Sequence, residues 1–236
     1  MSTDVELFEV PTSAGAMPAY RWLPAQGQGP GVVVVQEIFG VSTYIRRRAA
    51  DLAEAGFVVL VPQLYWRLPR NDLDESDPAV LEQAMSLAGQ LEWADATSDT
   101  RAALSALRAD PAVNGRVGLL GFCYGGGVAF QVAAEDSPDA LVSYYGSALP
   151  GLLDLAESIT CPSLHHFGTA DAYIPMEQVA LIRRVVTAAP VPAQFETYDG
   201  AGHAFDNPAP AFHHPEASAL AWPRTLEFLS GHLHAT

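Results

Sequence analysis

The chain has 236 residues, of which 49% are hydrophobic and 17% are charged, and its net charge is −15. This length fits a single globular domain over residues 1–236. The sequence shows neither an apolar run long enough to span a membrane nor a signal-peptide pattern, so a cytoplasmic protein is expected. All 12 basic residues are arginines, against 27 acidic residues. Such an acidic surface argues against nucleic acids and anionic membranes as partners.

Strand patterns alternate with helix patterns along the chain. Strands are predicted at Val5–Val10, Ala19–Leu23, Val32–Val35, Phe57–Val61, Val117–Leu120, Ala140–Tyr145, Leu164–Phe167 and Ala193–Tyr198. Helices are predicted at Thr43–Ala55, at Val80–Leu107 with one break near Trp93, and at Gly126–Ala134, Glu177–Ala188 and Glu216–Leu229. The unbroken Val32–Val35 run suits a strand covered on both faces. The alternation predicts an α/β fold, with a mostly parallel sheet, helices on both faces and no separate lid domain.

A cysteine lies where one predicted strand turns into a helix. The segment Gly121-Phe122-Cys123-Tyr124-Gly125-Gly126 follows an apolar strand and opens a helix pattern of small residues. Glycines on both sides of a reactive residue permit the sharp turn of a nucleophile elbow. The start of a helix also offers free N–H groups to a thiolate or an oxyanion. Cys123 is therefore the candidate nucleophile, and its thiol is expected on an exposed turn.

Asp171 and His203 follow Cys123 in the order nucleophile, acid, histidine that α/β-hydrolases share. This order predicts an α/β-hydrolase fold. All three residues would emerge at the carboxyl ends of strands, where open parallel sheets bind their ligands. The Gln36–Gly40 loop follows a central strand and points toward the elbow. The N–H groups of Ile38 and Tyr124 are accordingly the expected oxyanion donors.

Motifs along nearly the whole chain resemble the dienelactone hydrolase family of carboxymethylenebutenolidase-like proteins. These motifs are Gln36–Val41, Val61–Tyr65, Gly121–Gly126, Tyr144–Gly146, Gly168–Pro175 and Ala201–Phe205. The resemblance implies a triad of Cys123, His203 and Asp171. It also implies that Glu37 contacts the resting thiol and helps to activate it when substrate arrives. A carboxylate beside a thiol disfavours the thiolate by like-charge repulsion, which would keep the cysteine unreactive until then.

The sequence departs from this family where dienelactone-cleaving members grip the substrate carboxylate. Asn207 and Leu81 stand where those members have arginines, and Met85 stands where they have a tyrosine. An arginine fork supplies charge and bidentate geometry that asparagine and leucine lack. We therefore expect a substrate other than anionic dienelactone. If an anion were preferred after all, Arg67 or Arg70 would be the replacement anchor.

Further expectations concern the pocket, metals and the remaining cysteine. The expected pocket residues are Phe39, Trp66, Leu81, Met85, Tyr145 and Asn207. No metal or organic cofactor is expected, and the neighbouring His165 and His166 should point to opposite faces of a strand. Arg46–Arg48 is expected to form a solvated helix face, and Cys161 to be a small buried side chain.

The function predicted from these residues is hydrolysis of small carboxylic esters or lactones through a thioester acyl-enzyme. Two alternatives remain open. A thioesterase or acyl transferase could use the same triad, and would be distinguished by a thiol or amine acceptor that outcompetes water. A non-catalytic homologue could bind a ligand without turnover. The expected partner is a small-molecule ester or lactone, and the expected state is a monomer or a small homo-oligomer.

Overall fold

A central sheet organises the computed structural model, which describes residues 5–69 and 71–234. Its eight strands lie in the order β1-β2-β4-β3-β5-β6-β7-β8. Neighbours from β4 across to β8 are parallel, whereas β1 and β2 pair antiparallel with each other and β2 pairs antiparallel with β4. The prediction of a mostly parallel sheet is confirmed. The strands are β1 (Val5–Thr12), β2 (Gly15–Trp22), β3 (Gly29–Val35), β4 (Val58–Pro62), β5 (Val113–Phe122), β6 (Ala140–Tyr144), β7 (Ser163–Gly168) and β8 (Ala193–Tyr198).

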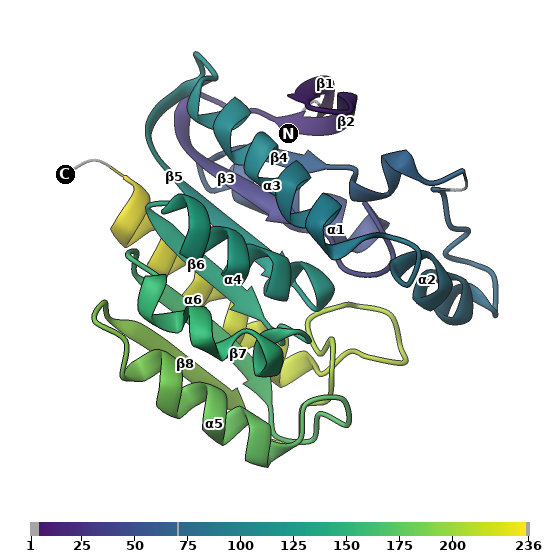
Figure 1. Cartoon of the computed structure of the whole chain (residues 1–236), viewed down its shortest axis with the longest axis vertical. Helices are drawn as coiled ribbons and strands as arrows, with labels where there is room; N and C mark the ends of the chain where they lie inside the picture. Colours follow the sequence, from purple (N-terminus) through teal and green to yellow (C-terminus); the bar gives the residue numbers. More distant parts are fainter. Residues whose placement is uncertain (1–4, 70, 235–236) are drawn as a thin grey trace.

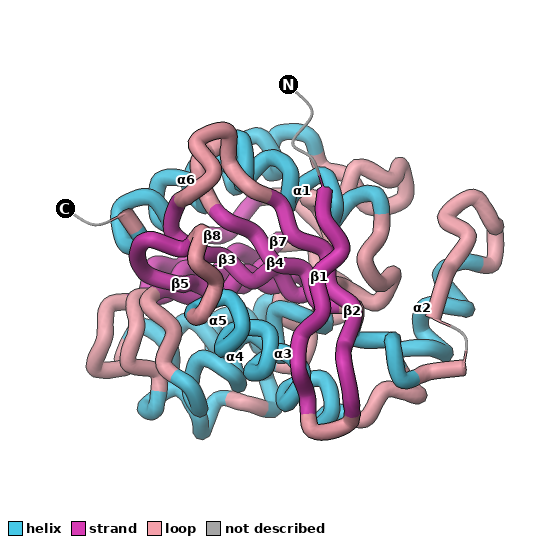
Figure 2. The backbone as a smooth tube through the Cα atoms, turned by 90° about the horizontal axis from the view of Figure 1, so that it is seen from above, coloured by secondary structure: helices cyan, strands magenta, loops and turns pink. Residues whose placement is uncertain are grey.

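Helices cover both faces of the sheet, as Figures 1 and 2 show. Helices α3, α4 and α5 lie on one face and α1 and α6 on the other, whereas α2 lies beside the sheet in both views. None of the described helices is long and apolar enough to cross a membrane. The helices are α1 (Thr43–Glu54), α2 (Val80–Ala88), α3 (Trp93–Arg108), α4 (Tyr124–Asp136), α5 (Met176–Thr187) and α6 (Pro215–Leu233), with 3₁₀ turns at Leu64–Arg67, Leu149–Gly151 and Leu153–Ser158.

The predicted helix boundaries hold with small shifts. The break expected near Trp93 is confirmed, because α2 ends at Ala88 and α3 begins at Trp93. Helix α4 begins at Tyr124, two residues before its predicted start and directly after Cys123. The cysteine therefore stands at the N-terminus of a helix, where N–H groups have no partner within the helix.

Strand β3 lies at the centre of the core and is buried along its whole length. Val33 and Val35 pack into the apolar layer under α3, α4 and α5, and Val32 and Val34 into the layer under α1 and α6. Alternate side chains of a strand point to opposite faces, so a continuous valine run fills both layers. Burying each such side chain stabilises the fold by about 1.5–3 kcal/mol.

The paired histidines of β7 point to opposite faces, as predicted. The His165 ring stacks on Phe195, and His166 hydrogen-bonds to the Tyr198 hydroxyl (2.8 Å) and the Thr225 hydroxyl (3.0 Å). Burial lowers the pKa of His165 to about 4 and also lowers that of His166 well below its usual range, so both rings are neutral core groups. Cys161 is buried, also as predicted, and its thiol is free. Within the described part of the chain, no group of three or more His, Cys, Asp and Glu side chains is placed to hold a metal ion.

Candidate active site

The turn between β5 and α4 holds Cys123 in a conformation that needs glycine neighbours. Cys123 has φ 52° and ψ −114°, outside the backbone regions that non-glycine residues ordinarily adopt. A Cβ on Gly121 would collide with the carbonyl of Gly125, and a Cβ on Gly125 would collide with the carbonyls of Val35 and Gln36. Because these positions lack a Cβ, the first turn of α4 packs closely against the C-terminal end of β3. Cys123 is only 8% exposed, so the expectation of an exposed turn was wrong.

The structure brings Cys123, His203 and Asp171 into one chain of hydrogen bonds. The distance from the Cys123 Sγ to the His203 Nε2 is 3.1 Å, and that from the His203 Nδ1 to the Asp171 Oδ2 is 2.8 Å. The other Asp171 oxygen accepts from the N–H groups of Tyr173 (2.8 Å) and Ile174 (3.0 Å). Because the Asp171 carboxylate accepts a hydrogen bond from the His203 Nδ1–H, Nε2 is the nitrogen that can exchange a proton with the thiol.

His203 is held in a state that favours its charged form. Burial lowers the pKa of the imidazole, but the hydrogen bonds with Asp171 and Cys123 outweigh it and raise this pKa to about 10. A positively charged imidazole beside a cysteine stabilises the thiolate, which is the reactive form. The ring lies between two tyrosines, with centroids 5.2 Å from Tyr145 and 5.0 Å from Tyr173.

Backbone strain is concentrated around these residues. Of the four described non-glycine residues with positive φ, three lie at the site, namely Cys123 (52°), Tyr145 (36°) and Ala204 (57°). Such conformations cost on the order of 1–3 kcal/mol each and persist only where the surroundings impose them. The Tyr145 N–H donates to the His166 carbonyl (2.7 Å), and its ring is fully buried behind His203. Tyr145 therefore supports the imidazole from behind and does not form a pocket wall.

Two backbone N–H groups, one beside Glu37 and one beside Cys123 in sequence, have no turn or cap acceptor among the described residues. The Glu37–Gly40 turn is closed by the Gly40 N–H on the Glu37 carbonyl (3.1 Å), and the Tyr65 hydroxyl holds the Ile38 carbonyl (2.8 Å). In residues 5–69 and 71–234, no turn or cap hydrogen bond uses the N–H of Ile38 or of Tyr124. Free, fixed donors are what an oxyanion hole requires. Their assignment as the oxyanion pair stays a prediction.

Glu37 bonds with Asn207 and not with the thiol. Asn207 Nδ2 donates to the Glu37 Oε1 (2.9 Å), whereas the side-chain partner of the Cys123 thiol is His203. The resting contact between Glu37 and Cys123 that the resemblance implied is therefore not formed in this structure. The reason is that the amide of Asn207 engages the carboxyl group, while the imidazole takes the thiol.

The protonation of Glu37 depends on its burial. Burial raises the pKa of Glu37 to about 8, against the lowering effects of the Asn207 hydrogen bond and of His203. Smaller contributions from the carboxyl groups of Glu75 and Asp206 are part of this rise. Glu37 is thus largely uncharged at neutral pH and gains its negative charge as the pH rises through about 8.

We predict that Glu37→Gln changes the reactivity of Cys123 only at alkaline pH. Below about pH 7 both proteins carry a neutral group at position 37, so their rates of alkylation by iodoacetamide should agree. Above about pH 9 only the wild type carries a negative charge there, so the variant should react several-fold faster. The ratio of the two rates is measured against pH, with the exposed Glu82→Gln as control. A ratio that does not change with pH would show that the Glu37 charge does not act on the thiol.

A small cavity lies next to Glu37 and contains two of the predicted pocket residues. Its volume is about 80 Å³, and Phe39 and Asn207 both line it. The ring of Phe39 packs against Phe212, with centroids 5.9 Å apart. The remaining lining residues are Glu37, Ser42, Glu75, Val80, Ala209 and Phe212. Among the described residues, its polar lining is carboxyl, amide and hydroxyl groups, with no arginine.

Three other predicted pocket residues lie elsewhere. Leu81 and Met85 are exposed on α2 and do not line this cavity, because α2 presents Val80 to it instead. The Trp66 indole donates to Asp99 (2.7 Å), so that ring belongs to the contact between the 64–67 turn and α3. Arg67 bonds to the same carboxylate (2.6 and 3.0 Å) and is not free to anchor a substrate. Arg70 lies outside the described residues.

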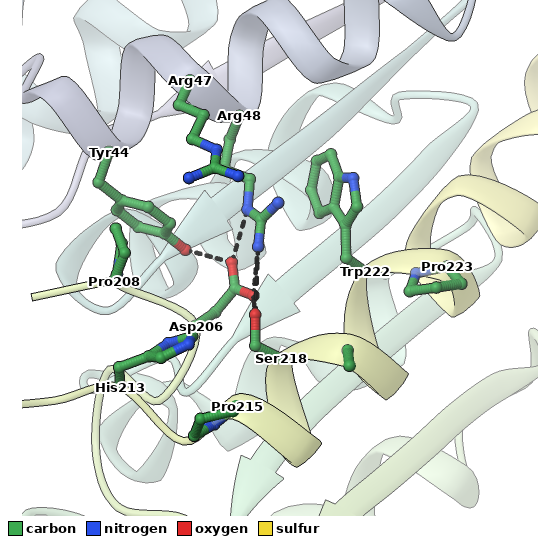
Figure 3. A pocket seen from close by; sticks show the side chains of 11 residues that line it. Tyr44, Arg47, Arg48, Asp206, Pro208, His213, Pro215, Ser218, Trp222 and Pro223 are labelled. Atoms are coloured by element: carbon green, nitrogen blue, oxygen red, sulfur yellow. Dashed lines mark hydrogen bonds and ion pairs between the residues drawn. The ribbon is translucent and has the colours of Figure 1, made fainter.

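A buried ion pair beside the site has no counterpart in the sequence analysis. Figure 3 shows Asp206 between Arg48, Tyr44 and Ser218. Asp206 accepts from Arg48 (2.6 and 2.8 Å), from the Tyr44 hydroxyl (2.6 Å) and from the Ser218 hydroxyl (2.6 Å). The expectation of a solvated Arg46–Arg48 face is therefore wrong for Arg48, whose side chain is 11% exposed.

This ion pair fixes the loop that carries two site residues. Asp206 lies between His203 and Asn207 in sequence, so its bonds to α1 and α6 hold both in place. The cavity of Figure 3, about 390 Å³ in volume, lies beside the pair and is not lined by a triad residue. No sequence pattern links an arginine in α1 to an aspartate in this distant loop.

Comparisons with known proteins agree with the fold. The sequence pattern of the dienelactone hydrolase family matches residues 17–233. A carboxymethylenebutenolidase of Pseudomonas sp. (strain P51) is 38% identical over 91% of this chain and 90% of its own length, and that of Pseudomonas putida is 36% identical over 88% of each. The crystal structure of a candidate dienelactone hydrolase from Klebsiella pneumoniae is 29% identical, with a TM-score of 0.84 over 98% of this chain and 99% of that one.

Proposed function

Because this chain belongs to the dienelactone hydrolase family, we propose that it hydrolyses small, uncharged carboxylic esters and lactones with Cys123 as its nucleophile. The observation that carries the proposal is the hydrogen-bonded chain from the Cys123 Sγ through His203 to Asp171, at 3.1 and 2.8 Å. A buried turn with strained φ and a free N–H at the start of α4 supports the same assignment.

The first half of the reaction transfers the acyl group to the thiol. His203 Nε2 takes the thiol proton, and the sulfur attacks the substrate carbonyl to form a C–S bond. The N–H groups of Ile38 and Tyr124 hold the negative oxygen that develops. When the C–O bond breaks, the departing alkoxide takes the proton from Nε2, and a thioester remains on Cys123. In a lactone the alcohol stays attached to the acyl group.

The second half releases the acid. A water molecule gives a proton to His203 Nε2 and attacks the thioester carbonyl, again with the oxygen held by the two N–H groups. Collapse breaks the C–S bond, and the sulfur recovers the proton from Nε2. Asp171 keeps the imidazole oriented and stabilises its positive charge in both halves. The proposed mechanism uses only these residues and water, and calls for no metal ion or organic cofactor.

The lining of the small cavity supports uncharged substrates. Glu37 and Glu75 line it, together with Asn207 at the position where an arginine was expected from the family. Each charge-assisted hydrogen bond to a carboxylate contributes roughly 1.5–3 kcal/mol, which an asparagine amide does not supply. A carboxylate on the substrate would face the Glu75 carboxyl group beside a largely uncharged Glu37 and find no described guanidinium in the cavity.

We predict that this enzyme opens the methyl ester of a dienelactone faster than the free acid. The expected ratio of kcat/KM for lactone opening is about 10- to 100-fold in favour of the ester, the opposite of an arginine-anchored site. Asn207→Arg, which brings a guanidinium to the cavity, should shift the ratio toward the free acid. A wild-type preference for the free acid would contradict the proposed substrate class.

A further inference from the structure

A second hollow borders the triad at His203 and lies next to the Glu37 cavity, with which it shares Phe212. Its volume is about 380 Å³, and His203 is part of its lining. Tyr173 and Phe212 provide aromatic surface, and small residues provide most of the rest, namely Ala170, Ala172, Gly200, Gly202 and Ala211. His213 and His214 complete the lining, in which the described residues include no Asp, Glu or Arg side chain. We call this hollow the histidine-side groove.

Tyr173 gives this groove an aromatic wall. The Tyr173 side chain is exposed although it is large and apolar, with 62% of the residue accessible. Its N–H is bonded to the Asp171 carboxylate (2.8 Å), and its ring centroid is 5.0 Å from that of His203. The exposed Tyr173 ring therefore offers a flat surface beside the His203 imidazole.

Phe212 separates the groove from the Glu37 cavity, since it lines both. The two spaces differ greatly in size, about 80 Å³ against about 380 Å³. The bulkier part of a substrate therefore fits on the histidine side. Because His203 must give its proton to the departing oxygen, the leaving alcohol lies on that side as well.

From this geometry we infer that the histidine-side groove binds an aromatic leaving group, so that aryl esters of short, uncharged acids are favoured substrates. The inference rests on the proposed function and adds the class of alcohol. The departing phenolate oxygen lies at His203 Nε2, which protonates it, while the aryl ring packs on Tyr173 and Phe212. The flat aromatic surface of Tyr173 and Phe212 and the small residues around it suit an uncharged ring.

The test compares phenyl acetate with hexafluoroisopropyl acetate, whose alcohol resembles phenol in acidity but has no ring. Tyr173→Ala and Phe212→Ala are each expected to lower kcat/KM about tenfold for phenyl acetate and less than about twofold for the fluoroalkyl ester. Leu220→Ala, which removes an exposed apolar side chain of α6 that does not line the groove, serves as control and should change neither ester.

The outcomes separate the inference from the proposed function. Equal decreases of kcat/KM for both esters would show that Tyr173 and Phe212 position His203 and do not bind the aryl ring. Unchanged kcat/KM for both esters would show that they do neither. Either result overturns the inference and leaves the proposed function standing. Failure of the wild type to hydrolyse either ester overturns both.

Discussion

Replacement of Cys123 by alanine is expected to lower kcat for a neutral ester by about 10⁶-fold, the usual effect of removing a triad nucleophile. The thiol is the group that forms the acyl-enzyme in the proposed mechanism, and no other described nucleophile bonds to His203 Nε2. The fold should persist, because alanine removes one atom from a residue at the edge of the core. Steady-state kinetics and a thermal unfolding curve measure the two effects.

Cys161 provides the matched control for this experiment. It is the other cysteine of the chain, buried at the entrance to β7 and free of a disulfide. Cys161→Ala should retain wild-type turnover. Ester hydrolysis by Cys123→Ala within a few-fold of the wild-type rate would mean that the elbow is not the source of the nucleophile.

Arg48→Met is expected to lower the free energy of unfolding by about 3–5 kcal/mol, because it leaves a buried carboxylate without its counter-charge. The Asp206 side chain is fully buried, and Arg48 supplies two of its four side-chain hydrogen bonds. Tyr44 and Ser218 would remain as partners but carry no positive charge. Urea unfolding of the variant and the wild type gives the difference.

Two further variants separate charge from packing. Arg47→Met alters the exposed neighbour on α1 and should stay within about 0.5 kcal/mol of wild type. Adding Asp206→Asn to Arg48→Met removes the unpaired charge and should recover a large part of the loss. If Arg48→Met and Arg47→Met had the same free energy of unfolding, the ion pair would not anchor the loop.

The sequence predicted the fold well because its signals are local. The Val32–Val35 run, the break near Trp93 and the alternation of strands and helices all follow from the side chains of neighbouring residues. The glycines around Cys123 likewise indicate a tight turn, and the structure shows the carbonyl groups that exclude a Cβ at Gly121 and Gly125.

Features that depend on distant partners were not predictable in this way. In the sequence, Arg48 is one of three consecutive arginines in a predicted helix, and only the fold shows that it bonds to Asp206. Tyr145 and Trp66 are aromatic residues near the right motifs, but only the fold shows that one supports His203 and the other bonds to Asp99. The exchange of the Glu37–thiol contact for a Glu37–Asn207 hydrogen bond also depends on packing between separate loops.

The most direct test of the proposed mechanism is mass spectrometry of the protein during turnover of a slowly deacylating ester. The mechanism predicts a covalent adduct with the mass of the acyl group, located on the peptide that contains Cys123, released by hydroxylamine and absent from Cys123→Ala. An adduct on another residue, or rapid turnover in which no adduct forms under conditions that trap thioesters, would contradict a cysteine acyl-enzyme.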